Sequence, residues 1–126
     1  KFPTHGNLES WAKQGVLLLN TSLTVKAGTE NKNCHQFIWK WFTDEIISYI
    51  SKNKENIIFV LWGSPAYGKK DLIDNKKHEL VVSSHPSGLS CNKPMGGHSA
   101  FVNQDHFGKI NAKLKEWGKK EIDWQL

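Results

Sequence analysis

Two side chains in this sequence could bind a ligand through hydrogen bonds at the end of a strand. Asn20 carries an amide, which offers an acceptor oxygen and a donor nitrogen side by side to a ligand edge with the opposite arrangement. His85 carries an imidazole, which keeps one N–H donor even when the ring is neutral. The plainer alternatives are a turn-forming asparagine and a satisfied surface histidine, so the surrounding sequence has to decide.

The surrounding sequence supplies groups suited to a polyanion. Hydroxyls, backbone N–H groups and an ammonium group can all bind phosphate. They are supplied by Gly63, Ser64, Ser87, Ser90 and Lys93. The formal net charge is +5, which also favours polyanionic partners, because lysines on a phosphate backbone release counterions. The lysine clusters read equally well as solvated helix faces.

Three short apolar runs must position these side chains: residues 16–19, 57–61 and 80–82. None of the runs alternates with polar residues, so each predicts a strand buried on both faces. A helix is expected between the first two strands. Thr43 can cap it, and the apolar side chains of Phe42, Ile46 and Ile50 fall at a spacing of four. The strand and helix order predicts a three-layer α/β/α fold with a central parallel sheet.

A last helix is expected after a glycine-rich loop. Its apolar stripe consists of Phe107, Ile110, Leu114 and Trp117, and Gly118 can end it. In open α/β sheets, ligands bind beyond the carboxyl ends of the strands. Asn20, Gly63 with Ser64, and Ser84 with His85 all follow predicted strands, so they should share one edge. Ordinary polar capping explains any one of them, but three together favour a site.

The motifs then resemble one family across nearly the whole chain. Residues 11–20 are similar to the uracil-reading strand of family-1 uracil-DNA glycosylases. Leu-Trp-Gly-Ser at 61–64 resembles their glycine-serine loop, and His-Pro-Ser-Gly-Leu-Ser at 85–90 resembles their DNA-intercalation loop. Further matches to the family's C-terminal pattern are His106, Phe107, Asn111 and residues 122–124.

This resemblance implies that residues 1–126 are the C-terminal portion of a single glycosylase domain. Such an enzyme is a DNA-repair hydrolase that flips uracil out of DNA and cleaves its N-glycosidic bond. The implied roles are uracil N3–H and O4 recognition for Asn20, leaving-group stabilisation for His85 and a wedge for Leu89. Backbone contacts are implied for Gly63, Ser64, Ser87, Ser90 and Lys93. No cofactor and no metal are implied.

The sequence departs from the family pattern in three places. The catalytic Gly-Gln-Asp-Pro-Tyr-His segment is absent, and with it the strand that carries the catalytic aspartate and would lie between strands 16–19 and 57–61. The chain alone is therefore expected to fold poorly and to be inactive. Gly88 stands where the loop usually has proline. The polar stretch 91–105 reads as an insertion; Cys91, His98 and His106 could bind zinc in principle, although their spacing fits no structural site.

The expected partners are uracil-containing single- or double-stranded DNA and the N-terminal part of the same domain. The chain is expected to act as a monomer without a membrane span. Two unpaired cysteines predict an intracellular location, in nucleus or cytoplasm, and the lysine and asparagine richness allows a virus-encoded origin.

Two alternative functions stay open. One is a glycosylase-like DNA-binding or assembly module without turnover, and the other is an α/β domain whose strand-end site takes another nucleotide ligand.

Overall fold

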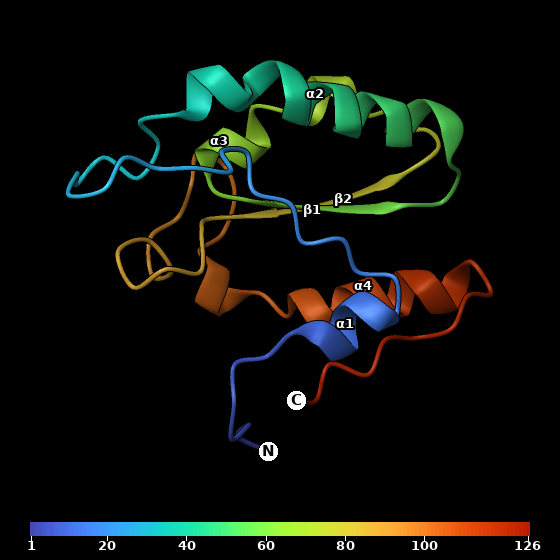
Figure 1. Ribbon diagram of the computed structural model, residues 1–126. Coiled ribbons are helices and arrows are strands. Elements are labelled where there is room, and N and C mark those ends of the chain that lie inside the picture. The colour runs from blue at the N-terminus through green and yellow to red at the C-terminus, as the bar shows by residue number, and fades with distance from the viewer. The chain divides into compact units, whose positions relative to one another are not determined.

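The computed structural model describes residues 1–126, which divide into two compact units (Figure 1). The central unit consists of residues 20–104. The terminal unit combines residues 1–19 with residues 105–126. None of the helices in either unit is both long and apolar enough to cross a membrane.

A pair of parallel strands forms the centre of the central unit. Strand β1 (Ile58–Trp62) lies beside β2 (Glu79–Ser83), with Ile58 opposite Glu79 and Trp62 opposite Ser83. Helix α2 (Gln36–Asn53) runs along one face of the pair (Figure 1), and the connection between the strands contains the short helices α3 (Ser64–Tyr67) and η1 (Lys70–Leu72). The parallel strands predicted at 57–61 and 80–82 are confirmed, and their carboxyl ends meet at one edge.

Helix α2 corrects the sequence prediction at its start, and its buried face differs from the apolar spacing. It begins at Gln36, so Thr43 lies inside the helix and does not cap it. The hydroxyl of Thr43 donates within the helix to the Trp39 carbonyl at 3.2 Å and reaches the Thr21 carbonyl at 3.4 Å. The buried stripe consists of Thr43, Ile47 and Ser51, one position away from the apolar side chains of Phe42, Ile46 and Ile50.

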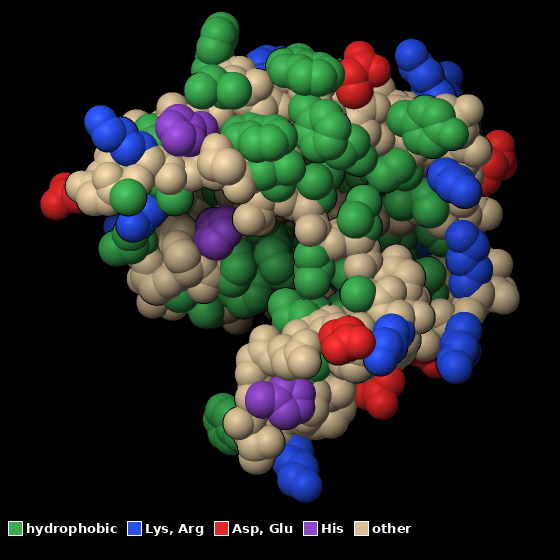
Figure 2. All heavy atoms as spheres, in the orientation of Figure 1, with side chains coloured by type: hydrophobic (Ala, Val, Ile, Leu, Met, Phe, Trp, Pro, Cys, Tyr) green, Lys and Arg blue, Asp and Glu red, His purple; other side chains and the backbone are tan.

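The reason for this one-residue offset is that α2 carries apolar side chains on its outer face as well. Phe37, Ile38, Trp41 and Tyr49 are 88%, 64%, 70% and 64% exposed. Figure 2 shows apolar side chains gathered over this helix. A helix that is apolar on several sides has no clear periodic signal. The sequence pattern therefore does not identify the face that includes Thr43 and Ser51 as the buried one.

The C-terminal end of α2 is tied to the sheet by His78, which precedes β2. The backbone N–H of Ile57 donates to His78 Nδ1 at 3.1 Å, so Nε2 carries the proton and donates to the Ser51 carbonyl at 2.8 Å. The Ser51 hydroxyl accepts from the Asp74 N–H at 2.9 Å. These bonds satisfy buried polar groups of helix, strand and connection together.

Residues 16–19 do not form the predicted strand. No ladder hydrogen bonds join them to another segment, and Leu17 and Leu18 are 65% and 54% exposed. A strand is defined by its backbone partner, and the sheet in this structure has only β1 and β2. The apolar run therefore has no ladder partner in this structure.

The terminal unit is held by three aromatic residues. Helix α1 (Glu9–Lys13) supplies Trp11, whose indole N–H donates to the Trp124 carbonyl at 3.1 Å. Helix α4 (His106–Glu116) supplies Phe107, whose ring lies 5.9 Å from Trp11 and 4.9 Å from Trp124, and the two tryptophans contact each other edge-on at 5.2 Å. Gly118, with φ of +70°, ends α4 as predicted, and the Lys119 N–H closes the end on the Leu114 carbonyl.

Candidate functional site

The carboxyl ends of β1 and β2 bring two of the predicted site segments together. Trp62 and Ser83 are the last paired residues, and the Gly63 N–H continues the ladder by donating to the Ser83 carbonyl at 2.9 Å. The chain therefore leaves β1 at Gly63 and leaves β2 at Ser84 from neighbouring points. We call this place the strand-end corner, and it contains Gly63, Ser84 and His85.

Gly63 is required by its conformation and by its neighbour. Its φ of +87° with ψ of 164° is a backbone geometry that favours glycine. A Cβ placed on Gly63 would lie 3.3 Å from Cβ and 3.8 Å from Cδ2 of His85. The absence of a side chain at position 63 thus lets the imidazole lie directly against the end of β1.

His85 is exposed, and one of its ring nitrogens is already engaged. The backbone N–H of Ser87 donates to Nδ1 of His85 at 3.0 Å. Because Nδ1 must accept in this bond, the proton of the neutral ring sits on Nε2. The arrangement leaves an Nε2–H donor on an exposed side chain, which is the group needed to stabilise an anionic leaving atom.

The loop after His85 is closed by its own hydrogen bonds. The Ser90 hydroxyl donates to the His85 carbonyl and contacts the Ser87 hydroxyl, both at 3.0 Å. The N–H groups of Ser90 and Cys91 donate to the Ser87 carbonyl at 3.0 and 2.9 Å. The structure therefore brings Ser87 and Ser90 together, as a shared phosphate-binding role would need.

Leu89 lies at the tip of this loop and is 86% exposed. It is not folded back on the core, which is the plain alternative for this residue. Gly88 before it has no left-handed φ, and a Cβ placed on Gly88 would meet no atom within 4 Å. Lys93 closes the segment, since its N–H donates to the Ser90 carbonyl at 2.9 Å.

Ser84 is an anchor of the corner and does not face outward. Its side chain is buried, and its hydroxyl accepts from the Phe101 N–H at 2.9 Å. Gln104, farther along the same segment, donates to the Val82 carbonyl at 3.1 Å. The sequence placed Ser84 among the outward polar groups, whereas the structure uses it to fasten residues 99–104 to the end of β2.

Asn20 stands apart from the corner in its surroundings. It is exposed and has no hydrogen bond to Gly63, Ser64 or His85. Its predicted strand is absent, so the backbone that leads to Asn20 has no ladder partner in this structure. The predicted uracil-reading role of Asn20 is therefore a prediction that this structure leaves open.

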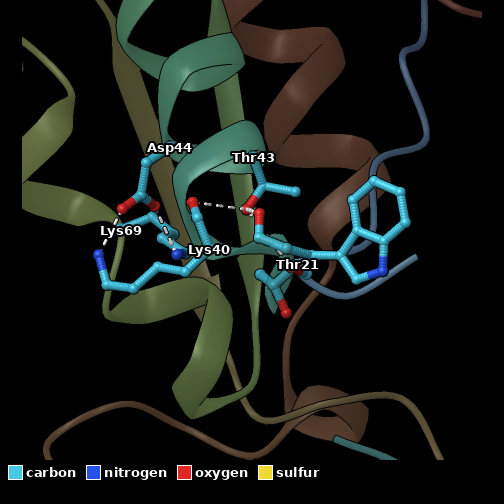
Figure 3. A network of polar contacts seen from close by, with 6 residues as sticks. Thr21, Lys40, Thr43, Asp44 and Lys69 are labelled. Carbon is cyan, nitrogen blue, oxygen red and sulfur yellow. Dashed lines mark hydrogen bonds and ion pairs between the residues drawn. The ribbon is translucent and has the colours of Figure 1, made fainter. Parts of the chain in front are cut away.

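A charged cluster beside Ser64 was missed by the sequence prediction. The Asp44 carboxylate pairs with Lys40 and with Lys69, both at 2.5 Å (Figure 3). Lys69 is buried, and the cluster lines a cavity of about 580 Å³ that also includes Ser64. The signal available was the spacing of four between Lys40 and Asp44; nothing in the sequence indicated Lys69.

Two pKa shifts have clear physical causes. Burial alone would raise the pKa of Asp44, but hydrogen bonds from Lys40 and Lys69 and their positive charges lower it below the usual aspartate value. Burial, with a smaller contribution from Lys109, lowers the pKa of His106 in α4. His106 is therefore a buried neutral side chain of the terminal unit at neutral pH.

The zinc alternative gains no support. Nowhere does the structure gather three histidine, cysteine or acidic side chains in an arrangement that could hold a metal ion, and this includes Cys91, His98 and His106. Cys34 and Cys91 are both free thiols.

Comparison with known proteins decides the family. Residues 5–115 match the family model described as the uracil DNA glycosylase superfamily. The chain belongs to this superfamily. Among curated relatives, a uracil-DNA glycosylase of Aliarcobacter butzleri is 50% identical over 119 residues, which cover 94% of this chain and 52% of that protein. One from Francisella tularensis subsp. novicida is 48% identical over 127 residues, covering 100% of this chain and 54% of the relative.

Solved structures agree with the sequence comparison. A variant of mimivirus UNG in complex with UGI superposes with a TM-score of 0.91 at 37% identity, covering 100% of this chain and 50% of that one. Mimivirus uracil-DNA glycosylase itself gives a TM-score of 0.90 at 36% identity and is covered to 49%. The predicted family and α/β fold class are thereby confirmed. The chain spans about half the length of the relatives it matches.

Proposed function

We propose that residues 1–126 form the C-terminal part of a glycosylase domain that removes uracil from DNA, with the strand-end corner as its leaving-group site. The observation that carries the proposal is the fixed tautomer of His85. An exposed Nε2–H donor, held against Gly63 and followed by an exposed apolar loop tip at Leu89, is an arrangement suited to an extruded base.

In this proposal His85 acts on the charge that develops during bond cleavage. Breaking the glycosidic bond gives the sugar oxocarbenium character and leaves the base as an anion. The Nε2–H of His85 donates to uracil O2 and stabilises that anion. The Ser87 N–H contributes by holding the ring in the tautomer that can donate.

Asn20 is proposed to read the base. Its amide oxygen accepts from uracil N3–H and its amide nitrogen donates to O4. Cytosine presents the reverse pair, so binding it would leave buried polar groups unpaired and would be disfavoured. This role requires that the Asn20 amide face the base pocket in the complete domain.

The remaining residues are proposed to hold the DNA. Leu89 enters the base stack and fills the gap left by the flipped nucleotide. The serine hydroxyls and backbone N–H groups on the two corner segments contact phosphates, together with the ammonium of Lys93. These proposed DNA contacts are Gly63, Ser64, Ser87, Ser90 and Lys93. We further propose an intracellular location, since both cysteines are free thiols.

The decisive experiment compares the chain with a complete domain. The complete domain is a chimera in which the part of the Aliarcobacter butzleri glycosylase outside the match precedes residues 1–126. Uracil release is measured from single-stranded and duplex oligonucleotides that each contain one uracil. We expect release by the chimera and none by residues 1–126 alone, because the apolar run 16–19 has no strand partner in this chain.

The matched control is the same chimera with His85→Leu, which keeps the apolar bulk and removes the donor. A chimera that folds and binds uracil DNA but releases no uracil would favour the alternative of a binding module without turnover. Uracil release by residues 1–126 alone would disprove the proposal that these residues need the rest of the domain for activity.

A further inference from the structure

The two segments that leave the strand-end corner meet a second time, through Tyr67 and His98. Tyr67 is the last residue of α3, four positions after Gly63. His98 lies in the stretch 91–105, which the sequence marks as an insertion. Their rings are in edge contact, with a centroid distance of 4.9 Å and an interplanar angle of 64°. Both side chains are partly buried.

The backbone of each residue in the pair is held by hydrogen bonds of its own segment. The Tyr67 N–H donates to the Gly63 carbonyl at 2.9 Å, which ties the tyrosine to the residue that lies against His85. His98 belongs to a tight turn in which Met95 and His98 exchange both backbone hydrogen bonds, at 3.0 and 2.9 Å. Gly96, with φ of +56°, allows that turn. The contact therefore joins two locally fixed elements.

Together these contacts close a frame. One side runs from the end of β1 through Gly63 and Ser64 to Tyr67. The other runs from the end of β2 through the loop 85–93 to the turn at Met95–His98. The frame is closed at one end by the β1–β2 ladder and at the other end by the Tyr67–His98 contact. All six residues that we propose to contact DNA lie on it: Gly63, Ser64, Ser87, Leu89, Ser90 and Lys93.

We propose that Tyr67 and His98 are positioning residues that fix the spacing between the two DNA-binding segments before DNA arrives. This inference rests on the proposed function, because it assumes that both segments bind one nucleic acid. Successive phosphates along a strand have a set spacing, so two segments held at that spacing lose less conformational entropy on binding. Neither residue contacts the reacting atoms.

A second contact supports Tyr67 on the side of its own segment. The Lys70 ammonium lies 4.3 Å from the centre of the Tyr67 ring and donates to its hydroxyl at 3.1 Å. The hydrogen bond to Tyr67 raises the pKa of Lys70. The tyrosine ring is thus held between a lysine of its own segment and a histidine of the insertion, which restricts its rotation.

The test uses paired substitutions in the complete domain. His98→Ala and Tyr67→Ala remove the ring contact, whereas His98→Phe and Tyr67→Phe keep two rings in place. Measured quantities are the Kd for uracil-containing duplex, the single-turnover rate at saturating protein, and the thermal unfolding midpoint. We expect the alanine variants to bind duplex on the order of three- to tenfold more weakly. Their saturated rate should be unchanged, and the phenylalanine variants should bind normally.

Unchanged duplex binding in both alanine variants would overturn the inference while leaving uracil release intact. A lower saturated rate with unchanged Kd would also overturn it, because that result assigns the pair to chemistry. If the parent chimera neither binds nor cleaves uracil DNA, the proposed function fails and the inference fails with it. The unfolding midpoint of the alanine variants separates local positioning from general instability, since weaker binding at an unchanged midpoint is the result expected from positioning. Weaker binding with a markedly lower midpoint would assign the effect to instability of the fold and overturn the inference.

Discussion

The strand-end corner and the segment around Asn20 differ in how their side chains are fixed. At the corner, Gly63 continues the β1–β2 ladder, and the Ser87 N–H fixes the ring of His85. Around Asn20, an apolar run of similar length has no backbone partner, and Leu17 and Leu18 are exposed. Both segments are predicted to contribute to the site, but only the strand-end corner is fixed by backbone hydrogen bonds to a neighbouring segment in this structure.

This difference indicates that the two proposed steps, leaving-group stabilisation by His85 and base reading by Asn20, depend on different parts of a glycosylase domain. In the proposed function, leaving-group stabilisation rests on His85, which lies in the loop directly after β2. Base reading, in the same proposal, depends on where the Asn20 side chain points, and residues 16–19 before it have no ladder partner in this structure. The corner should therefore tolerate changes in the rest of the domain better than the Asn20 segment does.

The largest expected effect tests the corner. In the complete domain, His85→Leu should lower the single-turnover rate of uracil release about 10²- to 10³-fold, since one donor to the developing anion is lost. DNA affinity should change little, because the donor acts mainly as charge develops. The loss should be equal on single strands and duplex. A large drop in DNA affinity with an unchanged rate would instead make His85 a binding residue.

A smaller effect is expected for the open segment. Asn20→Ala in the complete domain should cost about 1–3 kcal/mol of uracil recognition, or roughly 5- to 150-fold in kcat/KM. Asn20→Asp is the matched variant, because a protonated carboxyl presents a different donor pattern and could admit cytosine. The measurement is release from uracil and cytosine substrates in parallel. Full activity of Asn20→Ala would remove Asn20 from the base pocket.

The smallest effect concerns the loop tip. Leu89→Ala should weaken duplex binding by on the order of tenfold, because part of an apolar side chain no longer fills the stack. The effect should shrink on single-stranded DNA, where little stacking has to be broken. Matched oligonucleotides with one uracil, with and without a complementary strand, give the comparison. Equal losses on both substrates would show that Leu89 only packs against the protein.

Much of the corner could be read from the sequence, because its signals are local. Short apolar runs predicted β1 and β2, and the residues directly after them identified the positions that converge. The contact of His85 with the backbone of Ser87 could not be foreseen, since it depends on the path of the loop. The buried role of Ser84 was hidden for the same reason: its partner, Phe101, lies beyond the polar insertion.

The errors concern features that sequence patterns describe poorly. The run 16–19 has the composition of a strand, but composition cannot supply a partner. Helix α2 has apolar residues on its outer and inner faces, so its buried stripe lies one position away from the apolar side chains at a spacing of four. Tyr67 and His98 were not recognised as a pair, because contacts between two loops leave no periodic signal.

The cluster of Asp44 with Lys40 and Lys69 gives the central unit a weak point in acid. Because the folded pKa of Asp44 is lowered, its ionised form stabilises the fold above the ordinary aspartate pKa, and this stabilisation is lost as pH falls through the lowered value. Once the carboxyl is protonated, two ammonium groups that shared one anion face each other without it. The protection factors of the α2 amides near Asp44, which correct for the slower intrinsic exchange at low pH, should therefore fall first on acidification. We expect α2 to loosen from the segment after β1 before the strands separate.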